Sequence, residues 1–265
     1  MTKYFFLFFA AALFFACNNS DESKNKDNTT SAEEEQLRKD IKEYPDSLAL
    51  KNKLINYFAD NKNYENAIKE NNLLLAKDSN NADLWDSEAR LYFLNQDTAH
   101  AIKAFEKAIQ ISPNPQYFIS LATLYAQTGN AESLIITDTL IAKSKGNASL
   151  QAFFIKGLYY TYTKDKLKAV QYFDECLKID YTFLDAYREK AIALYDLEKY
   201  AEALKVLETE LALSRTDEEI YFWTGKCLEK LGKKEEAIEN YKQALQLAPD
   251  YAEAKDALAK LGAVQ

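Results

Sequence analysis

The 265-residue chain is poor in the residues that break or bend regular structure, with only six glycines and four prolines. A sheet protein needs many tight turns, and tight turns depend on these two residues, so their scarcity argues against a β-fold. Hydrophobic residues make up 48% of the chain, which is enough to build a core. The composition therefore predicts an all-α protein.

Histidine and cysteine are equally scarce. His100 is the single histidine, and the three cysteines, Cys17, Cys176 and Cys227, lack the spacing of metal ligands. The sequence contains no glycine-rich phosphate loop and no convincing pairing of a nucleophile with a base. We therefore expect no catalytic residue, no metal site and no cofactor.

Basic residues are outnumbered by acidic ones, 33 to 41, so the formal net charge is −8. A surface that binds duplex nucleic acid needs clustered lysine and arginine to displace counterions. This balance excludes nucleic acid as an expected partner.

The amino terminus begins with a short apolar run, residues 4–16, that ends abruptly at Cys17. As a helix at ~1.5 Å per residue it would reach ~20 Å, short of a ~30 Å hydrocarbon core. With Lys3 before the run and Ala16 ahead of the cysteine, residues 1–16 resemble a bacterial lipoprotein signal peptide. Phe14 departs from the aliphatic residue usual in that motif, which leaves open an uncleaved anchor or an ordinary signal with a chance cysteine.

The lipoprotein resemblance implies that Cys17 carries the lipid and attaches the chain to the bacterial outer membrane, on its periplasmic face or at the cell surface. Residues 17–31 combine low hydrophobicity with many charges, so we expect them to form a disordered tether.

A spacing of 34 residues recurs along the remainder of the chain. Ala237, Tyr241 and Ala244 share one helical face, and two of them are small enough to let a neighbouring helix approach. The same spacing recurs upstream, at Ala203, Leu207 and Glu210, at Ala169, Phe173 and Cys176, and at Ala101, Phe105 and Ala108. Before each such helix lies another in which an aromatic residue precedes a small one by four, as in Trp85 and Ala89, Phe118 and Ala122, Phe153 and Gly157, Tyr187 and Ala191, and Tyr221 and Gly225.

These paired helices resemble the tetratricopeptide repeat. The resemblance implies an α-solenoid of about six helical hairpins, at residues 48–81, 82–114, 115–149, 150–183, 184–217 and 218–251. An N-terminal helix, residues 32–47, is expected before them and a capping helix, residues 252–265, after them. Two repeats depart from the pattern: the third lacks the alanine–aromatic–alanine spacing, and the first has Lys51 where an aromatic residue is usual.

In this family, positions 2, 5, 9 and 12 of each repeat face a concave groove. The resemblance implies a partner-binding groove at Phe93, Ile119, Phe154, Leu158, Arg188, Ile192, Tyr195, Phe222 and Lys226. The apolar residues would anchor an apolar segment, and the two basic ones would orient its acidic flanks. The alternative is that Phe154, Leu158 and Ile192 pack beneath a neighbouring hairpin.

The family resemblance implies a non-enzymatic scaffold or adaptor that gathers protein or peptide segments in the cell envelope, anchored to the membrane by its lipid. A second possibility is a cell-surface lipoprotein that binds glycan or peptide ligands for nutrient uptake, and a third is an accessory to a partner enzyme. The uptake family carries long insertions, which this sequence lacks, so the scaffold is favoured.

Overall fold

The computed structural model describes residues 31–143 and 147–263, which contain fourteen α-helices and no strand. The predicted all-α solenoid is confirmed. Cys17, the predicted signal peptide and most of the predicted tether lie outside the described residues. The helices are α1 (Ala32–Glu43), α2 (Leu48–Asp60), α3 (Tyr64–Leu75), α4 (Ala82–Leu94), α5 (Thr98–Ile111), α6 (Pro115–Gln127), α7 (Glu132–Lys143), α8 (Asn147–Tyr162), α9 (Lys166–Ile179), α10 (Leu184–Asp196), α11 (Tyr200–Leu213), α12 (Glu218–Lys230), α13 (Lys234–Leu247) and α14 (Ala252–Lys260).

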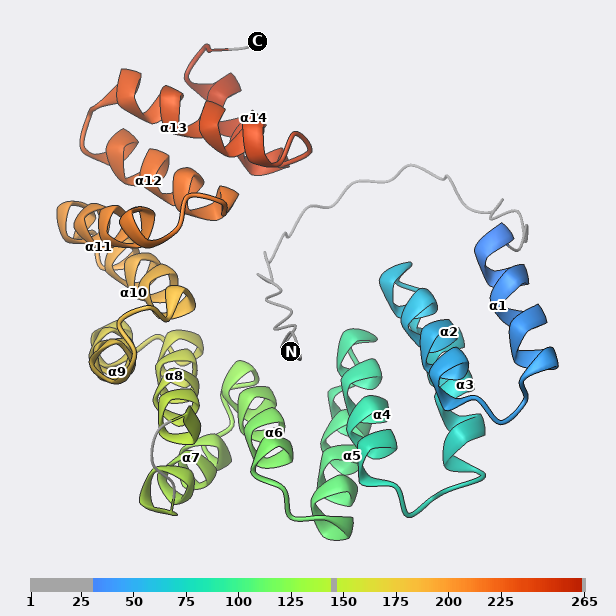
Figure 1. The fold of residues 1–265 in the computed structure, drawn as a ribbon. Coiled ribbons are helices and arrows are strands. Elements are labelled where there is room, and N and C mark those ends of the chain that lie inside the picture. The colour runs from blue at the N-terminus through green and yellow to red at the C-terminus, as the bar shows by residue number, and fades with distance from the viewer. Residues whose placement is uncertain (1–30, 144–146, 264–265) are drawn as a thin grey trace, which may run out of the picture.

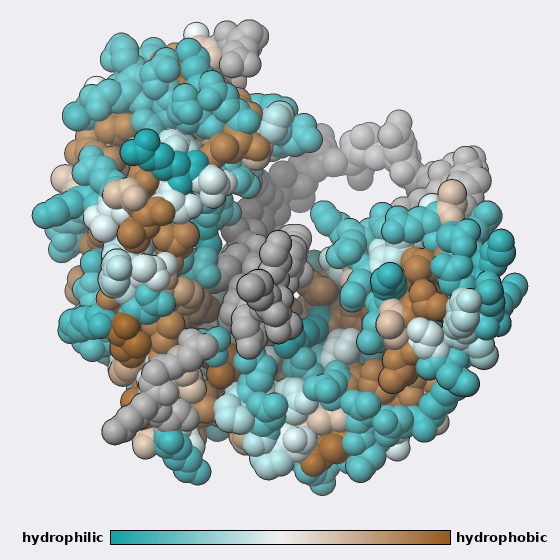
Figure 2. Space-filling model, in the orientation of Figure 1, coloured by the Kyte–Doolittle hydropathy of each residue, from teal (hydrophilic) through white to brown (hydrophobic). Residues whose placement is uncertain are grey.

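The hairpins stack side by side into an open arc (Figure 1). The first helices of the central hairpins, α6, α8 and α10, lie toward the inside of the arc, and their partners α7, α9 and α11 lie toward the outside. On the face seen in Figure 2, hydrophilic side chains cover most of the surface and hydrophobic ones gather in short strips between helices. Each hairpin therefore buries its apolar side chains against its neighbours, as expected for a solenoid.

A residue with positive φ makes the turn inside each hairpin. These residues are Lys62, Gln96, Gly129, Lys164, Glu198 and Gly232, separated by 34, 33, 35, 34 and 34 residues. Only two of the six are glycine, the residue that adopts this left-handed conformation without steric cost. Polar caps help to begin several helices; for example, Asp97 and Asp165 each accept a hydrogen bond from a backbone N–H of the following helix.

Close packing within a hairpin depends on a missing side chain opposite a ring. A Cβ on Gly225 would come within 2.7 Å of Tyr241, and a Cβ on Gly157 would collide with Phe173. Both rings are fully buried. Glycine is thus needed at these two positions to admit the aromatic side chain of the second helix.

The third hairpin keeps the packing of the repeat with different residues. Ser133, Thr137 and Leu140 of α7 take the buried positions, at the usual spacing of four and three residues. The Ser133 hydroxyl donates to the carbonyl oxygen of Ala122 at 2.9 Å, and the Thr137 hydroxyl donates to that of Ser133 at 2.8 Å. The register of the repeats shifts by one residue here, since the turn spacings on either side of Gly129 are 33 and 35 residues.

Candidate functional site

The predicted groove residues come from five first helices, α4, α6, α8, α10 and α12. Four of the seven apolar and aromatic residues among them are buried: Ile119 is 4% exposed, Phe154 5%, Leu158 4% and Phe222 9%. Phe93, Ile192, Tyr195 and Lys226 are partly exposed, and Arg188 is buried. The structure therefore divides the predicted row into core residues and accessible ones.

Phe154 and Leu158 belong to the core between hairpins, as in the alternative that the sequence left open. The ring of Phe154 lies 5.6 Å from that of Phe173 and 5.1 Å from that of Phe183, measured between centroids. Ile119 joins the same cluster because α6 packs directly on α8. An exposed anchor role for these three residues does not fit the structure, since a neighbouring helix already covers them.

Arg188 is engaged within the chain instead of reaching toward the acidic flank of a partner. It forms ion pairs with Asp185 at 2.6 Å, Asp217 at 2.5 Å and Glu219 at 3.1 Å, and only 9% of its side chain is exposed. Burial raises the pKa values of Asp185 and Glu219, and the guanidinium opposes that rise. Its role is therefore to neutralise acids where hairpins five and six meet.

Three partly exposed residues in the carboxyl-terminal half of the arc, together with the buried Phe222 next to them, form a cluster that we call the aromatic patch: Tyr195, Phe222, Trp223 and Lys226. The Lys226 ammonium lies 5.2 Å from the ring centre of Tyr195, 5.4 Å from that of Trp223 and 5.8 Å from that of Phe222. The Tyr195 and Trp223 rings meet edge to face at 5.5 Å. The patch brings an ammonium and three rings from α10 and α12 together.

The sequence missed Trp223, which is the residue after the predicted Phe222. The residue type could have pointed to Trp223, because tryptophan is a common anchor in protein interfaces and this one is at a partly exposed position of its helix. Phe93 lies apart from the patch on α4, where it packs against the buried cluster that contains Ala104 and Phe105.

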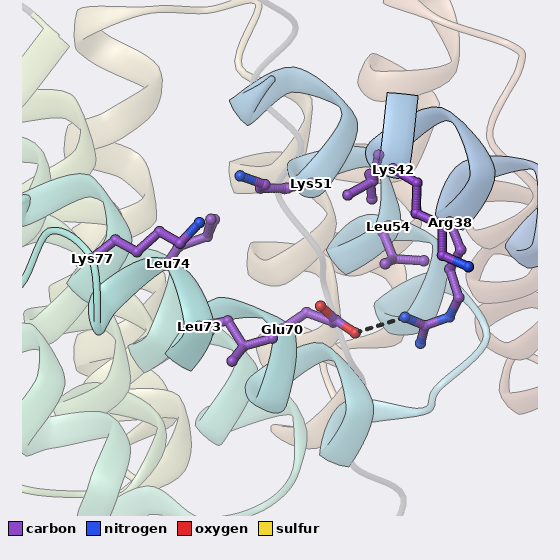
Figure 3. A pocket seen from close by; sticks show the side chains of 9 residues that line it. Arg38, Lys42, Lys51, Leu54, Glu70, Leu73, Leu74 and Lys77 are labelled. Atoms are coloured by element: carbon purple, nitrogen blue, oxygen red, sulfur yellow. Dashed lines mark hydrogen bonds and ion pairs between the residues drawn. The ribbon is translucent and has the colours of Figure 1, made fainter. Parts of the chain in front are cut away.

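A pocket of about 430 Å³ opens at the other end of the arc, between α1, α2 and α3 (Figure 3). Its apolar lining comes from Ile41, Leu54, Leu73 and Leu74, and its charged lining from Arg38, Lys42, Lys51, Glu70 and Lys77. In Figure 3 a dashed line joins Arg38 of α1 to Glu70 of α3, an ion pair of 3.2 Å.

Buried ionisable groups occur away from both surfaces. Burial raises the pKa of Glu210 to about 8, and neither carboxylate oxygen has a hydrogen-bond partner within the described ranges. Burial also raises the pKa values of the Cys176 and Cys227 thiols to about 12, so neither is an activated nucleophile. Across residues 31–143 and 147–263 there is no group of three potential metal ligands, and no helix is long and apolar enough to span a bilayer.

Comparison with protein families finds profiles described as tetratricopeptide repeat at residues 82–115, 150–183 and 188–252. Among curated proteins, anaphase-promoting complex subunit 3 of Schizosaccharomyces pombe is 24% identical over 189 residues, which are 71% of this chain. The chain spans 28% of the length of that relative.

Solved structures share the fold at low sequence identity. A tetratricopeptide repeat protein from Parabacteroides merdae has a TM-score of 0.68 and 17% identity, covering 86% of this chain and 91% of its own. PilW, described as a type IV pilus biogenesis factor, has a TM-score of 0.62 and 19% identity, with coverages of 79% and 97%. The Cut9–Hcn1 assembly has a TM-score of 0.60 and 15% identity, with coverages of 87% and 46%.

Proposed function

Because this chain contains tetratricopeptide repeats, we propose that it is a non-enzymatic scaffold that holds a protein or peptide segment on its aromatic patch. The observation that carries the proposal is the cluster of Tyr195, Trp223 and Lys226. These side chains are partly open to solvent, and the stacking of the hairpins does not require that exposure. Rings supply contact area at a low entropic cost, and an ammonium held over them can pair with a carboxylate of the partner.

Two features favour a scaffold over a ligand receptor. Successive hairpins are joined by short connections, such as Ile179 to Leu184 and Leu213 to Glu218, and residues 31–143 and 147–263 contain no inserted domain. A solenoid of this kind offers an extended surface instead of a closed cavity, which suits a peptide segment better than a small glycan.

We further propose that the scaffold works at the bacterial outer membrane, attached by lipid on Cys17, and that its partners are envelope proteins. The support is the signal-like segment 1–16 and the cysteine that follows it. PilW, which has a similar fold and is described as a type IV pilus biogenesis factor, is a precedent for such a role.

The attachment predicts a change of location on mutation. Cys17→Ser removes the thiol that would accept the lipid, so the chain should leave the washed membrane fraction and appear soluble or unprocessed. Fractionation and the mass of the amino-terminal peptide measure this, with Cys176→Ser as the matched control. A Cys17→Ser chain that is processed and still remains with membranes after a carbonate wash would contradict the lipid.

The aromatic patch predicts a local binding surface. A photo-crosslinker at position 226 should capture a partner in intact membranes, whereas one at Glu239 on α13, whose side chain is 69% exposed, should not. Tyr195→Ala should then weaken binding of the captured partner by ~2 kcal/mol, about thirtyfold, because a ring at an interface centre is lost.

Calorimetry with the purified partner measures the affinity, and the melting temperature of Tyr195→Ala shows whether the chain stays folded. Equal capture at positions 226 and 239, or full affinity in a folded Tyr195→Ala chain, would place the partner site elsewhere.

A further inference from the structure

The pocket between α1, α2 and α3 exists at a position where the other repeats place a ring. The fourth residue of the later repeats is aromatic, namely Trp85, Phe118, Phe153, Tyr187 and Tyr221, whereas the first repeat has Lys51. In the second hairpin, Trp85 packs against the buried cluster that contains Ala108 of α5. The residue 34 positions before Ala108 is Leu74, which lines the pocket.

The floor of this pocket is already suited to an aromatic side chain. Leu54 is 2% exposed and Leu74 is 4% exposed, so they form a packed apolar base. Leu73, at the edge, is 55% exposed, which is unusual for a leucine next to a cavity of about 430 Å³. A ring that entered here would remove this apolar surface from water.

The rim has a charge opposite to that of the chain as a whole. Four basic residues line the pocket against one acid, Glu70, in a protein with a net charge of −8. Glu70 is paired with Arg38, and Lys51 donates to the carbonyl oxygen of Pro45. Within the described part of the chain, Lys42 and Lys77 form no ion pair, so both ammonium groups are available to carboxylates.

We propose that this pocket binds an acidic partner peptide that inserts an aromatic side chain in place of the ring missing from the first repeat. The ring lies on Leu54 and Leu74, and flanking carboxylates of the peptide pair with Lys42 and Lys77. The pocket is formed by α1, α2 and α3, and the aromatic patch by α10 and α12, so either site can fail without the other.

The test uses the purified chain and a fluorescein-labelled five-residue peptide with a central tryptophan between glutamate and aspartate residues. Anisotropy should show saturable binding with a Kd below about 1 mM, and a peptide whose acids are replaced by lysines should bind at least about tenfold more weakly. Lys42→Glu with Lys77→Glu should lower the affinity at least about tenfold and leave the melting temperature unchanged, since both side chains are exposed.

The decisive variant is Lys51→Trp, which restores the ring of the repeat. It should raise the melting temperature and abolish binding of the peptide, because the chain then fills its own pocket. Lys53→Trp, at an exposed position of the same helix, is the matched control and should change neither quantity.

Peptide binding by Lys51→Trp at wild-type affinity would overturn the proposal. So would a wild-type chain that fails to bind the peptide while Lys51→Trp is stabilised, because the pocket would then be a packing defect. Saturable binding of dodecanoate without binding of the peptide would assign the site to an anionic lipid instead. If Lys51→Trp does not fold, the double variant with Lys42→Glu and Lys77→Glu still tests the proposal. Wild-type affinity of this folded variant for the acidic peptide would overturn the pairing of peptide carboxylates with the two lysines.

Discussion

Phe154→Ala is expected to lower the free energy of unfolding by ~3–5 kcal/mol, the usual cost of removing a buried aromatic ring. The side chain is 5% exposed and lies in the core formed by α6, α8 and α9. Its ring meets those of Phe173 and Phe183, so the deletion removes these contacts and leaves a cavity that the neighbouring helices can only partly close.

Urea unfolding followed by circular dichroism measures this change, and hydrogen exchange locates it. A solenoid can unfold in segments, so exchange should accelerate mainly in α8 and α9 and much less in α2 and α3. Tyr181→Ala is the matched control, since that aromatic side chain is 69% exposed, and it should change stability by less than ~0.5 kcal/mol. Equal losses in the two variants would mean that Phe154 faces solvent in the groove after all.

The wild-type chain is expected to lose stability as the pH rises, and the Glu210→Gln variant is expected to lose much less. The folded-state pKa of Glu210 is about 8 and its ordinary value is 4.5. Because the folded value is the higher one, the folded chain binds a proton that the unfolded chain releases. The stabilisation is complete below pH 4.5 and is lost as the pH rises through about 8.

The physical cause is burial of a carboxyl group without hydrogen-bond partners. Glu210 is fully buried on α11, and Arg188 offsets only part of the cost of ionising it, because Asp185, Asp217 and Glu219 share that guanidinium. At ~1.4 kcal/mol per pKa unit, the full effect would reach up to ~5 kcal/mol. Burial also raises the pKa of Glu189 to about 7, so a smaller dependence of the same sign should persist in the variant.

Urea unfolding at about pH 5 and about pH 9 measures the difference, and the loss between them should be smaller by ~3 kcal/mol or more in Glu210→Gln than in the wild-type chain. Glu208→Gln, at an exposed position of the same helix, should behave like wild type. If Glu210→Gln loses as much stability as wild type over this range, the carboxyl group does not titrate in the folded state as its burial implies.

The groove residues could be predicted only in part from the sequence. Position within a repeat decides which helix a residue belongs to and its approximate facing, and Tyr195 and Lys226 are partly exposed in the structure. It could not foresee that α6 would pack directly on α8 and cover Ile119 and Phe154. Exposure depends on the neighbouring hairpin, which a pattern within one repeat does not describe.

The sequence by itself determined the secondary structure and the pairing of helices into hairpins. Small residues and rings recur at helical spacing, as at Gly157 and Phe173 or Gly225 and Tyr241, and steric fit between them is a local matter that a periodic pattern records. The same pattern marked Lys51 as a departure and counted Glu210 among its matching positions, and it did not say what either side chain does.

Only the tertiary structure decided what Lys51 and Glu210 do in the folded chain. At Lys51 a missing ring leaves a basic pocket, because helices on either side hold the space open. At Glu210 a carboxyl group takes the place of a small residue and is enclosed, because α11 is covered by its neighbours. A cavity and a desolvated charge both arise from atoms of several helices together, so neither can be read from the residues of one helix.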